Sequence, residues 1–221
     1  MADQFEHYYT ENPKCKETRY TLSCKAFGKN IILETASGIY SPRNIDKGSL
    51  IHLKHVVINK KDKVLDLGCG YGTVGIFVKK LYPSTEVVMS DINKRAVNYA
   101  KRNIKKNNIQ AKVIQSDGFK KIKDSDFDVI LFNPPINAGL KVCYRLIASS
   151  FEHLKKGGSL QVVLRPRGGG ERLVKKIKSV FGNAEKVAKE DIYEIYIAKK
   201  TQEVPESEYD KKMFLKKKKK I

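Results

Sequence analysis

Apolar positions from residue 63 onward alternate between two kinds of spacing. Short unbroken apolar runs, typical of buried strands, alternate with longer segments whose apolar residues recur every three or four positions, typical of amphipathic helices. The strand-like runs occupy residues 63–68, 86–91, 111–117, 128–133, 159–165, 184–190 and 192–200. The helix-like segments occupy residues 73–82, 93–108, 139–158 and 170–182. This alternation predicts right-handed βαβ crossovers and a mostly parallel sheet with helices on both faces.

The end of the chain modifies this picture. Only Glu190 and Asp191 or so separate the last two predicted strands, which is too short for a crossover helix, so these strands should pair antiparallel at or near one edge. The helix-like segment 139–158 ends in Gly157 and Gly158, a pair that favours a left-handed C-cap. The expected fold class is therefore α/β, with a seven-stranded, mostly parallel sheet and an antiparallel strand near one edge.

The residues before this alternation predict a smaller β element. Residues 18–34 contain two strand-like runs joined at Gly28, Lys29 and Asn30, which is a hairpin pattern. After a loop-like stretch, residues 49–57 have apolar residues at helical spacing, and we expect them to form a helix across the sheet edge.

These patterns divide the chain into three parts. Residues 1–46 are expected to be a hairpin and loop extension packed on the core, and residues 47–200 to be the main domain. Residues 201–221 lose all periodicity and contain five consecutive lysines, so we expect a mobile tail with at most a weak attraction for polyanions.

Charge narrows the class of partner. The 221 residues include 44 lysines and arginines against 24 acidic residues, a formal net charge of +20. Such a field concentrates polyanions, of which nucleic acid is the commonest, and few enzymes for small neutral metabolites carry that surplus. The alternative interpretation is a lysine-rich proteome that raises the charge without a function.

Cysteine and histidine positions predict neither a metal site nor a disulfide framework. His52 and His55 stand three residues apart but lack a third ligand. The cysteines show no CxxC pair, which favours a reducing, intracellular and cytoplasmic setting. They are Cys15, Cys24, Cys69 and Cys143. An apolar leader and an apolar run of about 18 residues are both missing, so we expect neither secretion nor a membrane span.

A glycine loop follows the first strand of the alternating region and opens a helix. In "VLDLGCGYGTVG", residues 64–75, glycines let the backbone bend sharply and approach a ligand closely. The spacing Gly70-x-Gly72-x-x-Gly75 matches the dinucleotide fingerprint, with Asp91 near the position of the ribose-binding acid. A nicotinamide oxidoreductase is therefore one interpretation, although a proton donor or hydride site is not evident in the sequence.

The other interpretation of this loop is S-adenosylmethionine. Asp66 ends the first strand and would hold the amino acid end of that ligand, and Asp91 ends the second strand and would accept the ribose hydroxyls. Asp117 ends the third strand and would reach the adenine amino group, with Gly118 giving the ring room. Three successive strands that end in aspartate fit binding across the carboxyl edge of a parallel sheet, so we favour this interpretation.

Two sets of motifs carry a family resemblance. The chain resembles the class I methyltransferases that modify exocyclic or amide nitrogens in the motifs "VLDLGCGYG", "SDIN" and "NPP". It resembles one branch of them, the small-subunit ribosomal RNA guanine-N2 methyltransferases in their short archaeal single-domain form, in the motifs "HYY", "TASGIYS" and "DKG". The resemblance covers about residues 7–200. It implies a Rossmann-like fold, S-adenosyl-L-methionine as cofactor, and ribosomal or transfer RNA as partner. The sequence does not determine the oligomeric state, and a monomer is only slightly favoured. The resemblance also implies these cofactor-binding residues: Asp66, Gly68, Cys69, Gly70, Gly72, Asp91, Ile92, Asp117, Gly118 and Asn133.

The same resemblance gives a role to the stretch "FDVILFNPPINAG". An exocyclic amine is a poor nucleophile because its lone pair is delocalised into the ring. The side-chain oxygen of Asn133 and the carbonyl of Pro134 would each accept one N–H, which favours a pyramidal nitrogen. Pro135 would help to preset the loop, because proline fixes φ. We therefore expect catalysis by positioning and electrostatic preorganisation, without a covalent intermediate and without Cys69, which is a small packing residue in this interpretation.

The resemblance has one departure. The family pattern has an aromatic residue after the two prolines, and this chain has Ile136. A ring to stack on the target would then come from Tyr40, Tyr9 or Phe119, each of which also suits a packing role. The residues expected to contact the substrate are Ile136, Tyr40, Arg43, Arg165 and Arg167.

Two further hypotheses stay open. Methyltransferases that modify a glutamine amide of translation release factors also carry Asn-Pro-Pro, commonly followed by tyrosine, and Ile136 and the high positive charge argue against them. An RNA-binding protein with a vestigial methyltransferase fold would not need Asp66, Asp91 and Asn133, all of which are present.

Overall fold

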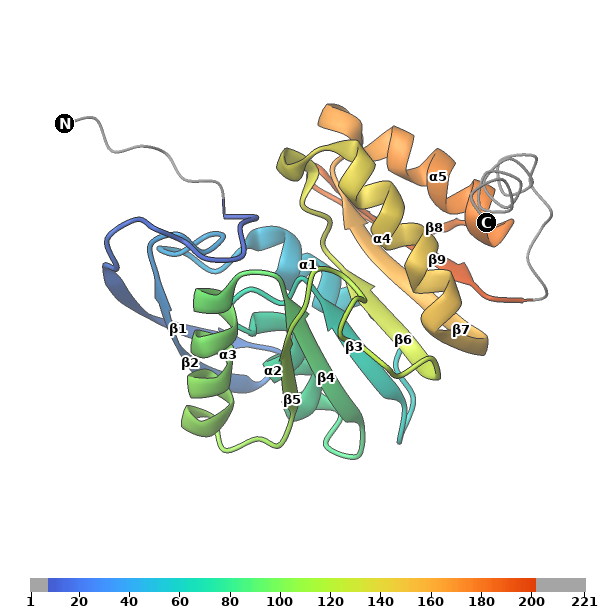
Figure 1. The fold of residues 1–221 in the computed structure, drawn as a ribbon. Helices are drawn as coiled ribbons and strands as arrows, with labels where there is room; N and C mark the ends of the chain where they lie inside the picture. The colour runs from blue at the N-terminus through green and yellow to red at the C-terminus, as the bar shows by residue number, and fades with distance from the viewer. Residues whose placement is uncertain (1–7, 202–221) are drawn as a thin grey trace.

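The computed structural model describes residues 8–201 and contains two β-sheets (Figure 1). A hairpin of β1 (Arg19–Ala26) and β2 (Lys29–Ala36) stands apart from a seven-stranded sheet with the order β5-β4-β3-β6-β7-β9-β8. Neighbouring strands from β5 to β7 are parallel, and β9 lies antiparallel between β7 and the edge strand β8. The predicted mostly parallel sheet with an antiparallel strand near one edge is confirmed. Its strands are β3 (Lys63–Leu67), β4 (Glu86–Asp91), β5 (Lys112–Gln115), β6 (Phe127–Phe132), β7 (Leu154–Leu164), β8 (Glu185–Glu190) and β9 (Tyr193–Lys199).

Helices cover both faces of the large sheet, as the alternating pattern predicts. Successive strand residues point to opposite faces, so Val64 packs in the cluster under α2 and α3, whereas Leu65 packs in the cluster under α4 and α5. Both side chains are fully buried. The helices are α1 (Lys47–His55), α2 (Thr73–Leu81), α3 (Lys94–Lys106), α4 (Leu140–His153) and α5 (Glu171–Phe181), with short turns η1 (Ile136–Ala138) and η2 (Pro166–Gly170).

Helix α1 packs on the side of the sheet that ends in the edge strand β8. Ile51 packs with Val163 of β7 and Ile195 of β9 in one buried cluster, and Lys54 binds Glu190 of β8 at 2.8 Å, so the helix reaches from β7 to the edge strand. Gln161 of β7 also binds the backbone after the helix, because its side chain accepts from the Val57 N–H at 2.9 Å and donates to the Val57 carbonyl at 2.7 Å. The start of α1 is thereby held close to the carboxyl ends of the central strands.

The turn of the hairpin lies one residue earlier than predicted. Lys29 and Asn30 pair with Ala26 and Lys25 in the ladder, and the two-residue turn is Phe27–Gly28 with φ of 53° and 69°. A turn with positive φ at both positions matches the twist of the strands. Phe27 adopts this unusual backbone while its ring packs edge-on against Phe77, with ring centroids 5.7 Å apart.

Two asparagines, one in α3 and one at its C-cap, fasten the hairpin to the main sheet domain. Asn103 Oδ1 accepts from the Glu34 N–H at 2.7 Å and its Nδ2 donates to the Glu34 carbonyl at 2.8 Å. One helical turn later, Asn107 makes the same pair of bonds to Ile32. Amide side chains thus satisfy the free edge of β2, which would otherwise be open for pairing with another strand.

The glycine pair after α4 is not a helix cap, which corrects another expectation. The helix ends at His153, and β7 begins at Leu154 with a register shift against β6. Gly157 has φ of 83° within this irregular opening, and a Cβ on Gly158 would lie 2.8 Å from the Phe127 carbonyl oxygen. The pair therefore permits close approach of β7 to β6.

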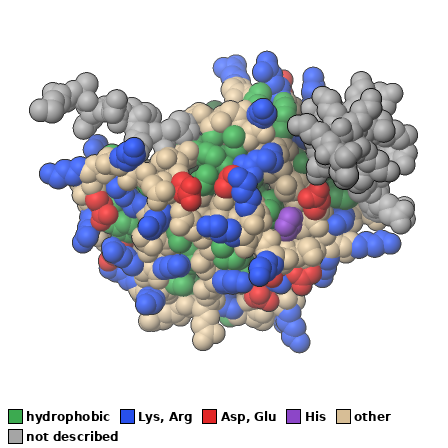
Figure 2. Space-filling view, in the orientation of Figure 1, with side chains coloured by type: hydrophobic (Ala, Val, Ile, Leu, Met, Phe, Trp, Pro, Cys, Tyr) green, Lys and Arg blue, Asp and Glu red, His purple; other side chains and the backbone are tan. Residues whose placement is uncertain are grey.

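The lysine-rich tail predicted for residues 201–221 lies outside the described residues except for Thr201, and the three-part division of the chain stays a prediction. Within residues 8–201, none of the helices is both long and apolar enough to span a membrane. Lysine and arginine side chains are spread over the face drawn in Figure 2.

Candidate functional site

A cavity of about 330 Å³ opens at the carboxyl ends of β3, β4, β6 and β7, a volume in the range of small-molecule sites. It lies where the strand order reverses, because β3 pairs with β4 on one side and with β6 on the other. Ligands of open α/β sheets bind at such a reversal. The lining includes most of the residues singled out from the sequence.

The glycine loop forms the floor of the cavity between β3 and α2. Gly68, Gly70 and Gly72 all have positive φ (76°, 56° and 96°), so the sharp turn needs glycine at these positions. The N–H groups of Gly68 and Cys69 both donate to the Ser90 carbonyl, at 2.8 and 2.9 Å, which fastens the loop to β4. Space is open where a Cβ would stand on Gly68 and Gly70.

Cys69 lies buried in this loop and lines the cavity. Burial and the nearby carboxylates of Asp66 and Asp91 raise the pKa of its thiol well above the ordinary value. A thiol held in its protonated form is a weak nucleophile, and this agrees with the packing role expected for it.

Asp66 is buried at the end of β3. Its Oδ2 accepts from the Gly75 N–H of α2 at 2.9 Å. Burial raises the pKa of this carboxyl to about 7, against the effect of the Gly75 hydrogen bond, and the charge of Asp91 raises it further. The carboxyl therefore titrates near neutral pH, and a cationic group in the cavity would favour its ionised form.

Asp91 ends β4 and holds the loops on both sides of it. Its Oδ2 accepts from the Gly70 N–H and its Oδ1 from the Asn93 N–H, both at 2.8 Å. Burial raises its pKa although these bonds favour the carboxylate. Each oxygen keeps a further lone pair, so the carboxylate can accept two additional hydroxyl groups from a ligand. Ile92 beside it also lines the cavity.

The carboxylate of Asp117 is the exception among the three aspartates, because this residue does not line the cavity. It accepts from Arg145 at 2.6 Å and from Lys120 at 2.7 Å, and Tyr9 donates to it at 3.3 Å. Burial acts to raise its pKa, but the hydrogen bonds from Lys120 and Arg145 outweigh that effect and the pKa is lowered. Its neighbour Gly118 does line the cavity.

Asn133 follows β6 and faces the cavity opposite the glycine loop. Its Nδ2 donates to Asp46 Oδ2 at 3.0 Å and to Ser49 Oγ at 3.4 Å, both at the start of α1. The Pro134 carbonyl accepts from the Ile136 N–H at 2.9 Å across an inverse γ-turn centred on Pro135 (φ −77°, ψ 70°). That carbonyl retains a second lone pair, and its direction is fixed by the turn.

Aromatic rings reach this part of the cavity from the N-terminal extension. Tyr40 and Tyr8 line the cavity, with their ring centroids 5.0 Å apart, and Ile136 lines it as well. Tyr9 also lines the cavity, whereas Phe119 does not and instead packs against His153 with ring centroids 4.2 Å apart. Burial raises the pKa of Tyr8 to about 12 and acts in the same direction on Tyr40, so both rings remain neutral phenols.

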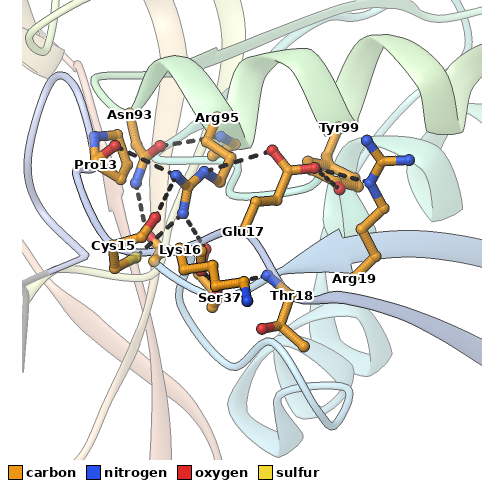
Figure 3. A network of polar contacts seen from close by, with 12 residues as sticks. Pro13, Cys15, Lys16, Glu17, Thr18, Arg19, Ser37, Asn93, Arg95 and Tyr99 are labelled. Atoms are coloured by element: carbon orange, nitrogen blue, oxygen red, sulfur yellow. Dashed lines mark hydrogen bonds and ion pairs between the residues drawn. The ribbon is translucent and has the colours of Figure 1, made fainter. Parts of the chain in front are cut away.

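Polar contacts hold the N-terminal segment against α3 (Figure 3). The guanidinium of Arg95 donates to the carbonyls of Ser37, Cys15 and Pro13 at 2.7, 2.9 and 3.3 Å. Asn93, which caps α3, donates to the Tyr8 carbonyl at 3.0 Å and to the Gly38 carbonyl at 2.8 Å. Tyr8 is thereby positioned beside the cavity by residues more than 80 positions away.

Of the three predicted arginines, two lie at the cavity. Arg165 and Arg167 line it, and the Arg165 guanidinium donates to the Tyr193 hydroxyl at 2.5 Å and stacks over that ring at 4.8 Å. Arg43 does not line the cavity; it lies over the ring of Tyr20 at 5.6 Å.

Four functional candidates had no predicted role: Ser49, and three residues that lie in the quoted motifs DKG, HYY and SDIN, namely Asp46, Tyr8 and Asn93. The N-cap pattern of Asp46 and Asn93 at helix starts was readable from the sequence, but their contacts with Asn133 and Tyr8 were not. Among residues 8–201, no group of three or more histidine, cysteine or acidic side chains is arranged to hold a metal ion.

Comparisons with known proteins agree with this arrangement. The model of the methyltransferase small domain family matches residues 30–197. YbxB of Bacillus subtilis, described as uncharacterised, is 34% identical over 198 residues, which cover 88% of this chain and 98% of YbxB. Ribosomal RNA small subunit methyltransferase C of Haemophilus influenzae is 35% identical over 139 residues, covering 61% of this chain and 42% of that protein. The chain thus spans less than half the length of that methyltransferase.

Solved structures share the fold. The 16S ribosomal RNA guanine-N2 methyltransferase RsmC of Thermus thermophilus, solved with AdoMet and guanosine, superposes with a TM-score of 0.74 at 23% identity, covering 85% of this chain and 52% of that one. A methyltransferase from Pyrococcus furiosus superposes with a TM-score of 0.58 at 23% identity, covering 69% of this chain and 81% of that one.

Proposed function

The chain belongs to the methyltransferase small domain family, and from this premise we propose that it transfers the methyl group of S-adenosylmethionine to the N2 amino group of a guanine in ribosomal RNA. The family consists of S-adenosylmethionine-dependent methyltransferases. The observation that carries the proposal is that Asn133 lines the same cavity as Asp66, Asp91 and the glycine loop. A methyl donor and a target amine would therefore meet in one enclosed space.

The residues at the glycine loop fit a methyl donor of this kind. Ser90 lines the cavity, and its Oγ is buried without a hydrogen-bond partner among the described residues, so a bound ligand would have an unsatisfied hydroxyl to pair with. The Asp91 carboxylate has capacity for both hydroxyls of a ribose, and Asp66 lies at the opposite end of the loop for an ammonium group. The Leu146 side chain fills the space beside Gly118, where a Cβ would lie 2.5 Å from Leu146 Cδ2, and the Asp117 carboxylate is already bound to Arg145 and Lys120. An adenine contact would therefore come from Ser116 or Gly118, which line the cavity.

The chemistry divides between donor and protein. The bound donor supplies an electrophilic methyl group on a sulfonium. The target amine donates one hydrogen bond to Asn133 Oδ1 and one to the second lone pair of the Pro134 carbonyl oxygen. These two hydrogen bonds hold its nitrogen in one orientation. Because both acceptors are fixed before substrate arrives, little reorganisation is needed at the moment of transfer. Proton loss follows methyl transfer, and solvent at the mouth of the cavity can take the proton.

The base itself needs a surface to lie on. Ile136 offers an apolar contact, and the rings of Tyr8 and Tyr40 stand in for the aromatic residue that the family pattern has after the two prolines. A base is gripped well by stacking on a phenol ring. Arg165 and Arg167 at the mouth would bind the neighbouring phosphates, and a base within a duplex would have to flip out to enter.

Two observations support an RNA substrate, and the second of them favours ribosomal RNA. The net charge of +20 suits a polyanion. The Haemophilus relative carries the name of a small-subunit ribosomal RNA methyltransferase, and the RsmC structure holds guanosine.

The test is incubation of the full chain with tritiated S-adenosylmethionine and separate pools of small-subunit ribosomal RNA, assembling small subunits, transfer RNA and release factor. We expect label in the ribosomal RNA pool. Label confined to transfer RNA would change the substrate, and label confined to release factor would support the glutamine hypothesis. Donor binding without label in any pool, including assembling small subunits, would support a vestigial methyltransferase fold.

A further inference from the structure

We propose that Asp46 is a positioning residue that fixes the side-chain amide of Asn133 with its oxygen toward the cavity, so that the site accepts only a target with two N–H hydrogens. This inference deepens the proposed function and rests on it for the identity of the reaction. The orientation of the amide itself follows from contacts that do not depend on the substrate.

Asp46 joins the N-terminal extension to the NPP loop through four hydrogen bonds. Its Oδ2 accepts from the Ser49 N–H at 2.7 Å, from Ser49 Oγ at 2.9 Å and from Asn133 Nδ2 at 3.0 Å. Its Oδ1 accepts from the Tyr40 hydroxyl at 3.0 Å. The same carboxylate therefore caps α1, holds the Asn133 amide and sets the position of an aromatic ring in the cavity wall.

The two groups beside the Asn133 nitrogen can only accept a hydrogen bond. A carboxylate has no hydrogen to give. The Ser49 hydroxyl donates its single hydrogen to Asp46, so its oxygen is left as an acceptor toward Asn133 at 3.4 Å. Reversing the amide would place its oxygen against two acceptor oxygens and would leave its NH₂ without a partner there. The structure therefore determines which end of the amide faces the cavity.

The orientation has a consequence for the substrate. Asn133 Oδ1 and the Pro134 carbonyl, which already accepts from Ile136, are both acceptors directed by rigid neighbours. An amino group has two hydrogens and satisfies both of them. A target hydroxyl donates a hydrogen bond to only one of these two oxygens, and a ring nitrogen or carbon without hydrogen donates to neither. One or both acceptor oxygens would then stay unpaired in the cavity, which disfavours such targets. Selection of the methylated atom would thus begin at Asp46.

The mounting of Asp46 is rigid enough for this role. The residue is the N-cap of α1, with φ −63° and ψ 123°. Helix α1 is itself fastened to the sheet through Ile51, which packs with Val163 and Ile195, all nearly fully buried. Packing of α1 therefore holds the Asp46 carboxylate in place relative to β6 and β7. We expect the Asn133 amide to move only when this carboxylate is removed.

Two substitutions separate the role in the amide contact from the role in the helix cap. Asp46→Ser retains a good N-cap oxygen, but its side chain is too short to reach Asn133 and Tyr40. Asp46→Asn is isosteric, and its carbonyl oxygen can replace Oδ2 while its NH₂ donates to the Tyr40 oxygen. Asp62→Ser is the matched control, since Asp62 is another loop aspartate that accepts a backbone N–H, from Asn59 at 2.7 Å, and it does not line the cavity.

The first readout needs no substrate. The Asn133 side-chain NH₂ signals in an amide NMR spectrum are identified by their loss in Asn133→Ala. We expect these signals to be protected from solvent exchange in the wild type, in Asp46→Asn and in Asp62→Ser, and to move to solvent-like positions with rapid exchange in Asp46→Ser. Unchanged signals in Asp46→Ser would overturn the proposal.

The second readout is methyl transfer from tritiated S-adenosylmethionine to small-subunit ribosomal RNA. We expect kcat to fall roughly 10- to 100-fold in Asp46→Ser, with KM for RNA and donor affinity within about threefold of the wild type, and to be nearly restored in Asp46→Asn. A normal kcat in Asp46→Ser, or an equal loss in Asp62→Ser, would overturn the positioning role. If the wild type labels no RNA, the proposed function fails, while the NMR signals still decide the orientation of the amide.

Discussion

The two halves of the cavity are built in different ways. The donor half comes from one contiguous stretch, residues 66–118, in which the backbone N–H groups of Gly70, Gly75 and Asn93 bind carboxylates at the ends of adjacent strands. The target half is assembled from four separate segments: residues 8–9, 40–49, 133–136 and 165–167. These segments are joined by side-chain hydrogen bonds such as the one between Asn133 and Asp46. A local, backbone-based site and a long-range, side-chain-based site should therefore fail separately when residues are replaced.

The largest expected effect is in the target half. Asn133→Ala removes an acceptor for the target amine, and turnover at saturating donor should fall roughly 10²- to 10³-fold. Donor affinity measured by calorimetry should stay within about threefold, because the donor half is untouched. Asn30→Ala, at an exposed position on the hairpin, is the matched control. Surviving turnover in Asn133→Ala would show that the amine-orienting role is wrong.

The corresponding substitution in the donor half is Asp91→Ala. It removes the acceptors for the ribose hydroxyls and also releases the Gly70 N–H, so donor affinity should fall roughly 100-fold by calorimetry. Asp124→Ala, which removes a partly exposed carboxylate from a surface ion pair with Lys63, controls for the change in charge. An unchanged affinity in Asp91→Ala would refute its ribose role.

Asp66 allows a test of the donor half that depends on pH. Its pKa of about 7 lies above the value of about 4 in an unfolded chain, so the folded state binds the extra proton. This contribution to stability is fully present below pH 4 and is lost as pH rises through 7. The free energy of unfolding should therefore lose roughly 2 kcal/mol between pH 5 and 6.5 through this residue.

Asp66→Asn should flatten that part of the stability profile, as measured by urea unfolding at a series of pH values. In the wild type, donor affinity should rise from pH 6 to 7.5, because the ionised carboxylate is the form that attracts an ammonium group. Equal pH profiles for the wild type and Asp66→Asn would contradict the assignment of this titration to Asp66.

The smallest expected effect is at the mouth of the cavity. Replacing Arg165 and Arg167 by alanine should raise KM for RNA by roughly 3- to 10-fold and lower the salt dependence of binding by one to two phosphate contacts. Arg43→Ala should have a smaller effect on KM for RNA and on the salt dependence of binding, since Arg43 lies against Tyr20 outside the cavity. An equal effect of Arg43→Ala would mean that general charge, and not these two arginines, holds the RNA.

The same contrast explains what could be predicted from the sequence. The sheet order near its edge and the glycine loop follow from spacing, because the residues concerned are neighbours along the chain. Asp66, Asp91 and Asn133 were accessible for the same reason, each being the polar residue at the end of a buried strand. The predictions for Lys29 and Asn30, which belong to the ladder and not to the turn, and for Gly157 were wrong because these positions depend on a strand register that spacing alone does not determine.

The contacts of the target half could not be predicted in this way. Asp46 and Asn133 are 87 residues apart, and Tyr8 and Asn93 are 85 apart. Local patterns identify Asp46 and Asn93 as helix caps, but the second hydrogen bond of each depends on how the extension packs on the core. The position of Asp117 is a further example, since its ion pair with Arg145 turns it away from the cavity although it follows a strand like the other two aspartates.

The identity of the methylated atom tests the central claim most directly. Small-subunit ribosomal RNA labelled by the wild type is digested to nucleosides and the product is identified by mass spectrometry, with Asn133→Ala in parallel. We predict N2-methylguanosine from the wild type and almost none from the variant. A methyl group on a ribose oxygen or a ring carbon would contradict the claim, because two fixed acceptors have no role in presenting such an atom.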